Sequence, residues 1–281
     1  MDLPSWDSRY RSPAVLRAEC DAMRESISEA ILTVLGESEV IGIYSHGSSL
    51  KPWATPIDYV PELSDVDVQI VLRDPATLDE DLARTFAVQA EYERLFAARV
   101  PAPLHVPRPQ IMVINRELGN PEFLSGPPGT AVTLFGQPFE KVRPQPDHTF
   151  VAAVDGKTLR NDAHDRWIAG LPAHLIDRPA KFLWQPLRDM SWRISPLAPR
   201  VLSVLGAGFE EAWGQNRSGL FSSLRNHGQP EFAETYARFY LEGWAFFQSN
   251  YTDADSARRG LLAGLAALRQ AKDIAGRSTA G

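Results

Sequence analysis

The spacing of hydrophobic and polar residues divides this chain into two parts. In the first part, apolar residues recur every three or four positions over residues 14–35 and 78–99, which is typical of amphipathic helices. Short apolar runs bounded by polar residues, Gly or Pro predict strands at 40–45, 66–72, 110–114 and 131–135. Beyond residue 149 only helical patterns occur, at 149–169, 179–191, 197–214, 217–226, 230–249 and 253–273. We therefore predict an α+β fold, in which a small mixed β-sheet with flanking helices is followed by an all-α helical bundle.

Two proline-containing stretches interrupt these patterns. Residues 136–148 are polar and carry three prolines, which predicts a boundary between a first domain, 1–142, and a helical second domain, 143–281. Residues 50–63 also carry three prolines, so we predict a loop there and not a helix. The aromatic residues of 230–249 recur at helical spacing, which is typical of a bundle core.

The main candidate for chemistry lies where two predicted strands meet short polar motifs. The strand at 40–45 leads into Gly47-Ser48, and Asp65 and Asp67 stand at the start of the strand at 66–72. Alternate strand residues point to the same face, so the two carboxylates lie side by side. Such a pair repels itself unless a cation lies between, and Mg²⁺ binds through one or two carboxylates together with substrate phosphates. Because a Gly-Ser turn lets backbone N–H groups approach a phosphate closely, the combination predicts phosphoryl or nucleotidyl transfer.

The order Gly47-Ser48, spacer, Asp65-x-Asp67 resembles the nucleotidyltransferase superfamily that includes DNA polymerase beta. The likeness is greatest to stand-alone bacterial members such as the aminoglycoside nucleotidyltransferases, and it is specific over residues 40–73. The resemblance implies an enzyme that moves a nucleoside monophosphate from an NTP to a hydroxyl acceptor, releasing pyrophosphate. It also implies two Mg²⁺ ions as cofactors.

The same resemblance gives roles to individual residues. Gly47 and Ser48 match the phosphate-holding motif of the family, and Asp65 and Asp67 match its catalytic, metal-binding pair. Two neighbours of the turn are further candidates for nucleotide binding, Ser49 and Lys51.

The spacer between the two motifs is longer than is usual for the family. Sixteen residues separate Ser48 from Asp65. Trp53, Asp58 and Tyr59 fall within this spacer. They form either a lid or substrate wall, or a packed surface loop, and we favour the packed loop.

The family takes a third carboxylate from a later strand, and this chain has an amide there. Gln110 occupies the matching position, and an amide cannot act as a general base and binds Mg²⁺ less strongly than a carboxylate. A base could come instead from Glu117, Glu122 or Asp165. The missing acid keeps a second hypothesis open, a nucleotide-binding pseudoenzyme or interaction module. A toxin-type enzyme that modifies a protein or a tRNA is a third.

Composition limits the partners of the protein. The formal net charge is −6, with −9 on residues 1–142 and +3 on residues 143–281. Binding to extended nucleic acid requires many phosphates to be neutralised, and an acidic chain is poorly suited to this. We therefore expect no extended nucleic acid as a partner and favour a small-molecule acceptor. No apolar run approaches the roughly 18–20 residues of a membrane span, and no signal peptide is recognisable, so we expect no membrane partner. The single cysteine, Cys20, fits a cytoplasmic location, while the oligomeric state stays open.

Four basic residues gather where the helical part begins. They form either a clamp for a triphosphate or a solvated helix face, and the solvated face is the commoner arrangement. These residues are Lys181, Arg188, Arg193 and Arg200.

Overall fold

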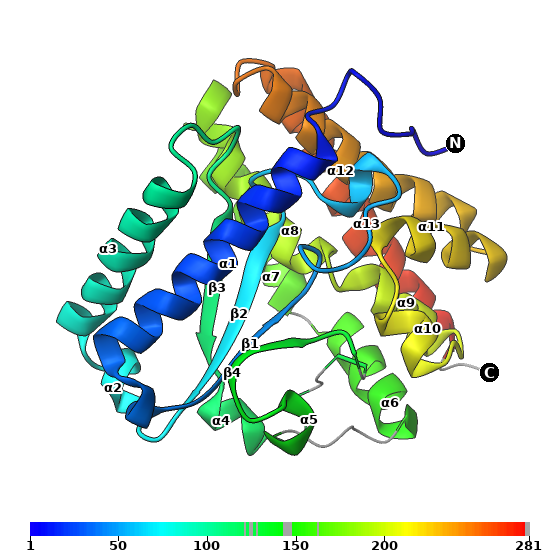
Figure 1. The fold of residues 1–281 in the computed structure, drawn as a ribbon. Coiled ribbons are helices and arrows are strands. Elements are labelled where there is room, and N and C mark those ends of the chain that lie inside the picture. Colours follow the sequence, from blue (N-terminus) through cyan, green and yellow to red (C-terminus); the bar gives the residue numbers. More distant parts are fainter. Residues whose placement is uncertain (121, 124–125, 128, 143–147, 162, 279–281) are drawn as a thin grey trace. The chain divides into compact units, whose positions relative to one another are not determined.

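The protein is a mixed α/β molecule with one four-stranded sheet among the residues that the structure describes. The structure is a computed structural model, shown in Figure 1, and it describes residues 1–120, 122–123, 126–127, 129–142, 148–161 and 163–278. In this part of the chain, no helix has the length and apolar character needed to cross a membrane.

The chain divides into two compact units. The sheet unit contains residues 11–51 and 64–146. The helical unit contains residues 1–10, 52–63 and 147–281. The domain boundary predicted after residue 142 lies close to residue 146, where the chain passes from the sheet unit to the helical unit for the last time. The prediction placed residues 1–10 and 52–63 in the first domain, whereas they belong to the helical unit.

The sheet unit is built on four strands in the order β3-β2-β1-β4. These strands are β1 (Val40–His46), β2 (Asp65–Leu72), β3 (Arg108–Val113) and β4 (Val132–Gly136). β1 runs antiparallel to both β2 and β4, whereas β2 and β3 are parallel. The prediction of a small mixed sheet is therefore confirmed, and each predicted strand is present with its ends shifted by at most two residues.

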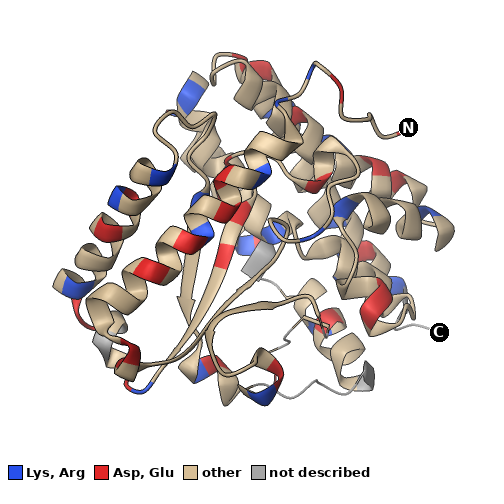
Figure 2. Cartoon of the chain, in the orientation of Figure 1, with Lys and Arg blue, Asp and Glu red and all other residues tan. Residues whose placement is uncertain are grey.

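One face of the sheet is covered by α1 (Pro13–Leu35), against which α3 (Leu82–Arg99) packs. Figure 2 shows acidic and basic residues interspersed along both helices. The buried stripe of α1 carries large apolar residues and the free thiol, as its periodicity predicts. Its members include Leu16, Cys20, Met23, Ile27 and Ile31. Short helices complete the unit, namely η1 (Glu37–Glu39), α2 (Ala76–Asp79), α4 (Asn115–Leu118) and α5 (Phe139–Val142).

The helix predicted over 78–99 is two helices. The first, α2, ends at Asp79, and Asp81 caps α3, because its carboxylate accepts a hydrogen bond from the backbone N–H of Arg84 at 3.0 Å. The buried side chains of α3 are Val88, Leu95 and Phe96. Two other large apolar residues of this helix, Leu82 and Phe86, are 66% and 56% exposed.

The opposite face of the sheet is apolar at one end. Tyr44 on β1 packs edge-on against Phe139 of α5, with ring centroids 5.0 Å apart. Val71 and Ile114 join them in one buried cluster. Because side chains alternate between faces, the other end of this same face carries His46 and the strand-start acids of β2.

The helical unit contains the helical segments predicted beyond residue 149, with several divided at turns. They are α6 (His148–Leu159), α7 (Ala163–Leu175), η3 (Ala180–Leu183), α8 (Trp184–Ile194), α9 (Leu197–Val204), α10 (Phe209–Trp213), α11 (Arg217–Asn226), α12 (Pro230–Gln248) and α13 (Ala254–Ser278). The aromatic stripe of α12 is buried, which confirms its predicted role as bundle core. Its fully buried members include Phe232, Tyr236, Phe239, Tyr240 and Trp244.

Residues 52–63, the long spacer, pack inside the helical unit. They contain one turn of 3₁₀ helix, η2 (Pro56–Asp58). The buried carboxylate of Asp58 accepts hydrogen bonds from the backbone N–H groups of Ala54 and Thr55, both at 2.8 Å. It also accepts from the backbone N–H of Ser218 at 2.7 Å and from the Ser218 hydroxyl at 2.9 Å. One acid therefore ties the spacer to the start of α11.

Two further side chains hold the same segment. Arg217 donates to the carbonyl of Ile57 at 3.1 Å, and its guanidinium lies over the ring of Tyr240. The indole N–H of Trp244 donates to the carbonyl of Pro56 at 2.7 Å. Of the two predicted roles for this spacer, the packed segment is the one that the structure supports, but much of it is buried and not at the surface.

The basic residues that open the helical part are partly interior groups. Arg188 is buried and donates to the carbonyl of Glu62 at 2.8 Å. Arg200 lies 3.5 Å from the buried carboxylate of Asp155, and burial lowers the pKa of Arg200 and raises the pKa of Asp155. Neither prediction for this group, the clamp or the solvated face, anticipated that all three of its arginines are buried or half-buried.

Candidate phosphate and metal site

Side chains from three neighbouring strands gather at one end of the sheet. Asp67 of β2 lies opposite His46 of β1 and opposite Gln110 of β3. Asp65 lies opposite Arg108. Because directly opposed residues of neighbouring strands point to the same side, all five side chains share one face.

Gly47 brings the turn after β1 against the acids of β2. Its backbone has φ +86°, a conformation that favours glycine. A Cβ at this position would overlap the carboxylate of Asp67. Two independent constraints, backbone conformation and space, therefore require glycine here. The predicted phosphate turn and the predicted metal pair are neighbours in the structure.

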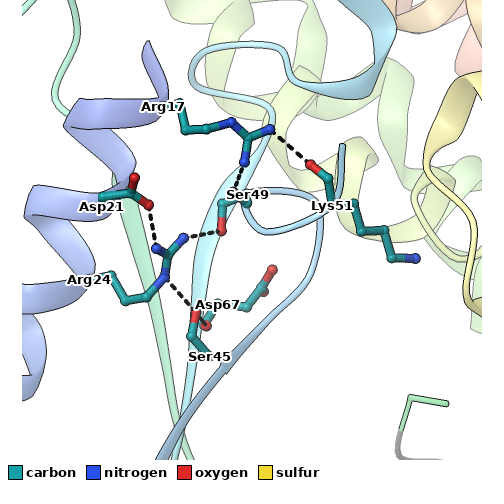
Figure 3. A network of polar contacts seen from close by, with 7 residues as sticks. All are labelled: Arg17, Asp21, Arg24, Ser45, Ser49, Lys51 and Asp67. Carbon is teal, nitrogen blue, oxygen red and sulfur yellow. Dashed lines mark hydrogen bonds and ion pairs between the residues drawn. The ribbon is translucent and has the colours of Figure 1, made fainter. Parts of the chain in front are cut away.

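Two arginines of α1 hold this turn from the other side of the sheet (Figure 3). Arg24 is buried and donates to the hydroxyls of Ser45 at 3.0 Å and Ser49 at 3.4 Å. Arg17 donates to the backbone carbonyls of Ser49 at 3.3 Å and Lys51 at 2.9 Å. The turn is thus fixed by guanidinium groups, which form several hydrogen bonds in a rigid geometry.

The side chains of Ser48, Ser49 and Lys51, which follow Gly47 in the turn, have different surroundings. The hydroxyl of Ser49 faces Arg24 and is fully buried, so within the described contacts it supports the turn. Ser48 is half-buried in the turn that the hydrogen bond from the Leu50 N–H to the Gly47 carbonyl closes at 3.2 Å. The side chains of Lys51 and Asp67 both point away from α1 (Figure 3). Lys51 therefore offers its positive charge on the side of the sheet where the acids lie.

The two carboxylates have different neighbours. Asp65 is only 7% exposed, and Nη1 of Arg108 lies 3.3 Å from its Oδ1. Asp67 is half-buried, and its backbone carbonyl accepts a hydrogen bond from the Ser45 hydroxyl at 2.9 Å. Arg108 thus supplies positive charge to one member of the predicted metal pair, and a cation that binds there must compete with it.

His46 adds a neutral ring at the end of β1. The pKa of His46 is lowered to about 4, mainly by burial and in smaller part by the positive charge of Lys51. Its Nε2 is buried and has no hydrogen-bond partner among the described residues. The imidazole beside the turn is therefore uncharged at neutral pH.

Gln110 stands where a third acid would complete the site. Its Cα is the register partner of Asp67, so its amide lies on the face that carries the acids. Within the described residues, no three His, Cys, Asp or Glu side chains come together as a metal-holding group. Asp65 and Asp67 lie on one face of β2, two positions apart.

The other acids that could have supplied a base lie elsewhere. Glu117 is in α4, beyond the end of β3, and Glu122 follows that helix. Asp165 belongs to α7 of the helical unit and forms an ion pair with Lys272. None of the three joins Asp65 and Asp67 in a metal-holding group of described residues.

Sequence reasoning missed the arginines that shape this site. Arg24 interrupts the apolar stripe of α1, next to Met23 and four residues after Cys20, and a charge on a buried face is a signal that could have been used. Arg108 could be found only by knowing that β3 is parallel to β2 and in which register.

The residues present fit a Mg²⁺ ion that shares its coordination with phosphate oxygens. Asp65 and Asp67 supply oxygen ligands from one face, and Mg²⁺ in nucleotide sites is held by one or two carboxylates plus substrate phosphates. The backbone of Gly47 lies against the carboxylate of Asp67, and the Lys51 side chain points to the side of the sheet away from α1, as that of Asp67 does. No protein-family model matches this chain, and no curated protein matches it either, so the site must be interpreted from its own residues.

Proposed function

We propose that this chain is a Mg²⁺-dependent nucleotidyltransferase that moves a nucleoside monophosphate from an NTP to a hydroxyl of a small molecule and releases pyrophosphate. The observation that supports it best is the close approach of Gly47 to the carboxylate of Asp67. This approach sets a glycine turn suited to phosphate beside two carboxylates suited to Mg²⁺, within a single compact unit.

Each residue has a task in this proposal. The backbone of Gly47-Ser48 and the ammonium group of Lys51 bind the triphosphate, and Asp65 and Asp67 hold Mg²⁺. When bound, Mg²⁺ orients the triphosphate and neutralises charge that develops during in-line displacement, and two ions divide that work. Arg24 keeps the turn in place through Ser45 and Ser49.

The acceptor hydroxyl must lose its proton during the reaction. Gln110, beside Asp67, cannot take that proton because an amide is not a base at neutral pH. A well-placed general base contributes roughly 10²–10⁴ in rate, so the proposal implies slow turnover with unactivated hydroxyls.

A second function, nucleotide binding without transfer, is supported by two specific observations. Gln110 stands in place of an acid, and Arg108 already neutralises Asp65 in part. A binding module would keep the phosphate turn and need no base. The two functions differ in whether pyrophosphate is formed.

Nucleotide binding is tested with the double variant Asp65→Asn and Asp67→Asn. Calorimetry with a nonhydrolysable ATP analogue and Mg²⁺ should show affinity at least about tenfold weaker than that of the natural chain, because each metal ligand loses its charge. The matched control replaces two exposed acids of α13, Asp255 and Asp273, by Asn, which changes the net charge equally. Equal affinity in both double variants, with both folded, would exclude the proposed site.

Turnover is tested by incubating the chain with NTPs, Mg²⁺ and a panel of small polyhydroxyl acceptors. Pyrophosphate release that requires Asp65 supports the transferase. Analogue binding without release by any NTP supports the binding module. Labelling of a protein or tRNA, with no small acceptor labelled, would replace the small-molecule acceptor in the proposal.

A further inference from the structure

An apolar cavity in the helical unit takes no part in the proposed function. It lies between α7, η3 and α13 and has a volume of about 510 Å³. Sites for small molecules typically have volumes of about 300–1,000 Å³ and apolar walls with a few polar groups. The described lining of this cavity consists of ten apolar residues and three arginines, with no acid among them.

The wall contributed by α13 is a stripe of three leucines, Leu261, Leu262 and Leu265. On the packed side, a Cβ at Gly264 would overlap Met190, and one at Gly260 would lie 3.1 Å from Leu187, both in α8. The leucines belong to the other side and line the cavity, where Leu262 is 66% exposed. Small residues thus make the close contact with α8, while large ones are left for the cavity.

Positive charge stands at both ends of this stripe. Arg258 and Arg269 flank the leucines at intervals of three and four residues, so they lie on the same side of α13. Arg178 enters from the turn after α7. Arg258 forms an ion pair with Asp255 at 2.6 Å, and Arg178 donates a hydrogen bond to the side-chain oxygen of Gln185 at 2.8 Å. With three arginines and this one paired acid, the rim keeps a net positive charge, and the interior is apolar.

We propose that this cavity binds a small amphiphilic anion, a molecule with an apolar chain and a carboxylate or a similar head. The chain would lie between α7 and α13, and the head would pair with the arginines at the rim, since guanidinium groups bind carboxylates through two parallel hydrogen bonds. The inner wall is sheltered, because Leu171 on α7 and Leu261 on α13 are each only 7% exposed, whereas the mouth is open at Ile176 and Leu262, which are 89% and 66% exposed. A concave site of this volume suits a small molecule better than a flat protein surface.

Dodecanoate, below its micelle concentration, is the probe. Calorimetry on the whole chain, without nucleotide or metal, should show saturable binding of one dodecanoate. Dodecanol and dodecyltrimethylammonium, of equal chain length, should bind at least about tenfold more weakly because a charge-assisted pair contributes about 1.5–3 kcal/mol. Since neither nucleotide nor Mg²⁺ is present, failure here is separate from failure of the transferase proposal.

Two matched substitutions locate the bound anion. Leu262→Glu should reduce dodecanoate affinity at least about tenfold by repelling the head, whereas Leu262→Lys should keep it, and this exposed position tolerates both. Arg269→Gln should weaken binding, and Arg277→Gln, at an exposed arginine outside the cavity, should not. Three results overturn the proposal. These are equal binding of the neutral or cationic probe, equal effects of Glu and Lys at Leu262, or a dimer in sedimentation that Leu262→Glu dissociates.

Discussion

Two shielded acids show how differently this chain uses a carboxylate. Asp58 in the helical unit and Asp65 in the sheet unit are both nearly inaccessible, at 1% and 7% exposed. Asp58 is surrounded by donors that the fold supplies, three backbone N–H groups and one hydroxyl. Asp65 has a charged side chain, Arg108, among its neighbours and a second acid, Asp67, two positions along the same strand. Burial alone therefore does not separate a structural acid from a candidate site acid.

The difference follows from where each acid lies. Asp58 closes a 3₁₀ turn and joins it to the start of a helix, where unpaired N–H groups need an acceptor. Asp65 and Asp67 lie at the start of β2, a central strand whose backbone is hydrogen-bonded to β1 and β3. Their side chains are therefore not needed to pair backbone groups of the sheet. We therefore expect the first acid to control folding and the second pair to control ligand binding.

The largest effect is expected from Asp58→Asn. The substitution keeps the shape of the side chain but presents amide donors to the N–H groups that now donate to Asp58, so buried donors face one another. We expect the free energy of unfolding to fall by about 2–4 kcal/mol, measured by urea denaturation. Ser218→Ala is the milder companion, because it removes only the hydroxyl and should cost about 1 kcal/mol.

The double variant Asp65→Asn and Asp67→Asn completes this comparison. Removing two like charges from one face should leave the free energy of unfolding unchanged or raise it, while the affinity for the nucleotide falls. If the site variant were as destabilised as Asp58→Asn, the distinction between a structural acid and a site acid would fail.

The next effect is expected from Gly47→Ala. A methyl group here would collide with the carboxylate of Asp67 and displace a metal ligand. We expect affinity for the ATP analogue with Mg²⁺ to fall about a hundredfold, in line with the loss of charge-assisted contacts of 1.5–3 kcal/mol. Binding calorimetry measures this directly.

Gly206→Ala provides the control for backbone strain. Gly206 has φ +92°, similar to Gly47, but a Cβ there would meet no atom within 4 Å. Both variants should lose a comparable, small amount of stability from the positive φ, about 1–2 kcal/mol. Only Gly47→Ala should lose binding. Loss in both, or in neither, would show that the approach of Gly47 to Asp67 carries no function.

Much of the fold could be predicted from the sequence because it rests on local periodicity. The four strands and α1 each have an apolar pattern with clear ends, and these elements lie where the pattern placed them. The errors arose where tertiary contacts decide. Asp81 caps α3 and so divides the predicted helix, and Phe86 is exposed because no periodicity reveals which face of a helix finds a partner. The spacer reads as a loop, yet its place inside the helical unit depends on contacts with Ser218, some 160 residues away.

The residues of the candidate site also fall into those that a local pattern reveals and those that depend on tertiary contacts. Asp65, Asp67 and Gly47 could be found because their spacing along two strands is visible in the sequence. Arg108 could not, because it meets Asp65 through a parallel strand pairing whose register no local pattern specifies. The hydroxyl of Ser49, expected to face a nucleotide, is bonded to Arg24 of α1, and that contact depends on how a helix lies on the sheet.

The smallest expected effect, and the one that most sharpens the comparison, is a gain from Gln110→Glu. The new carboxylate would lie on the same face as Asp67 and would supply the third acid that the pair lacks. If the protein is a transferase limited by its missing base, pyrophosphate release should rise about tenfold, below the roughly 10²–10⁴ of an evolved base because the geometry is not optimised. Gln89→Glu, on the exposed side of α3, adds the same charge away from the site and should change nothing. A gain confined to Gln110→Glu would mean that the natural chain has two-thirds of a catalytic site. Release that stays absent, together with tighter Mg²⁺ binding, would instead favour a binding module whose amide at Gln110 keeps the bound nucleotide intact.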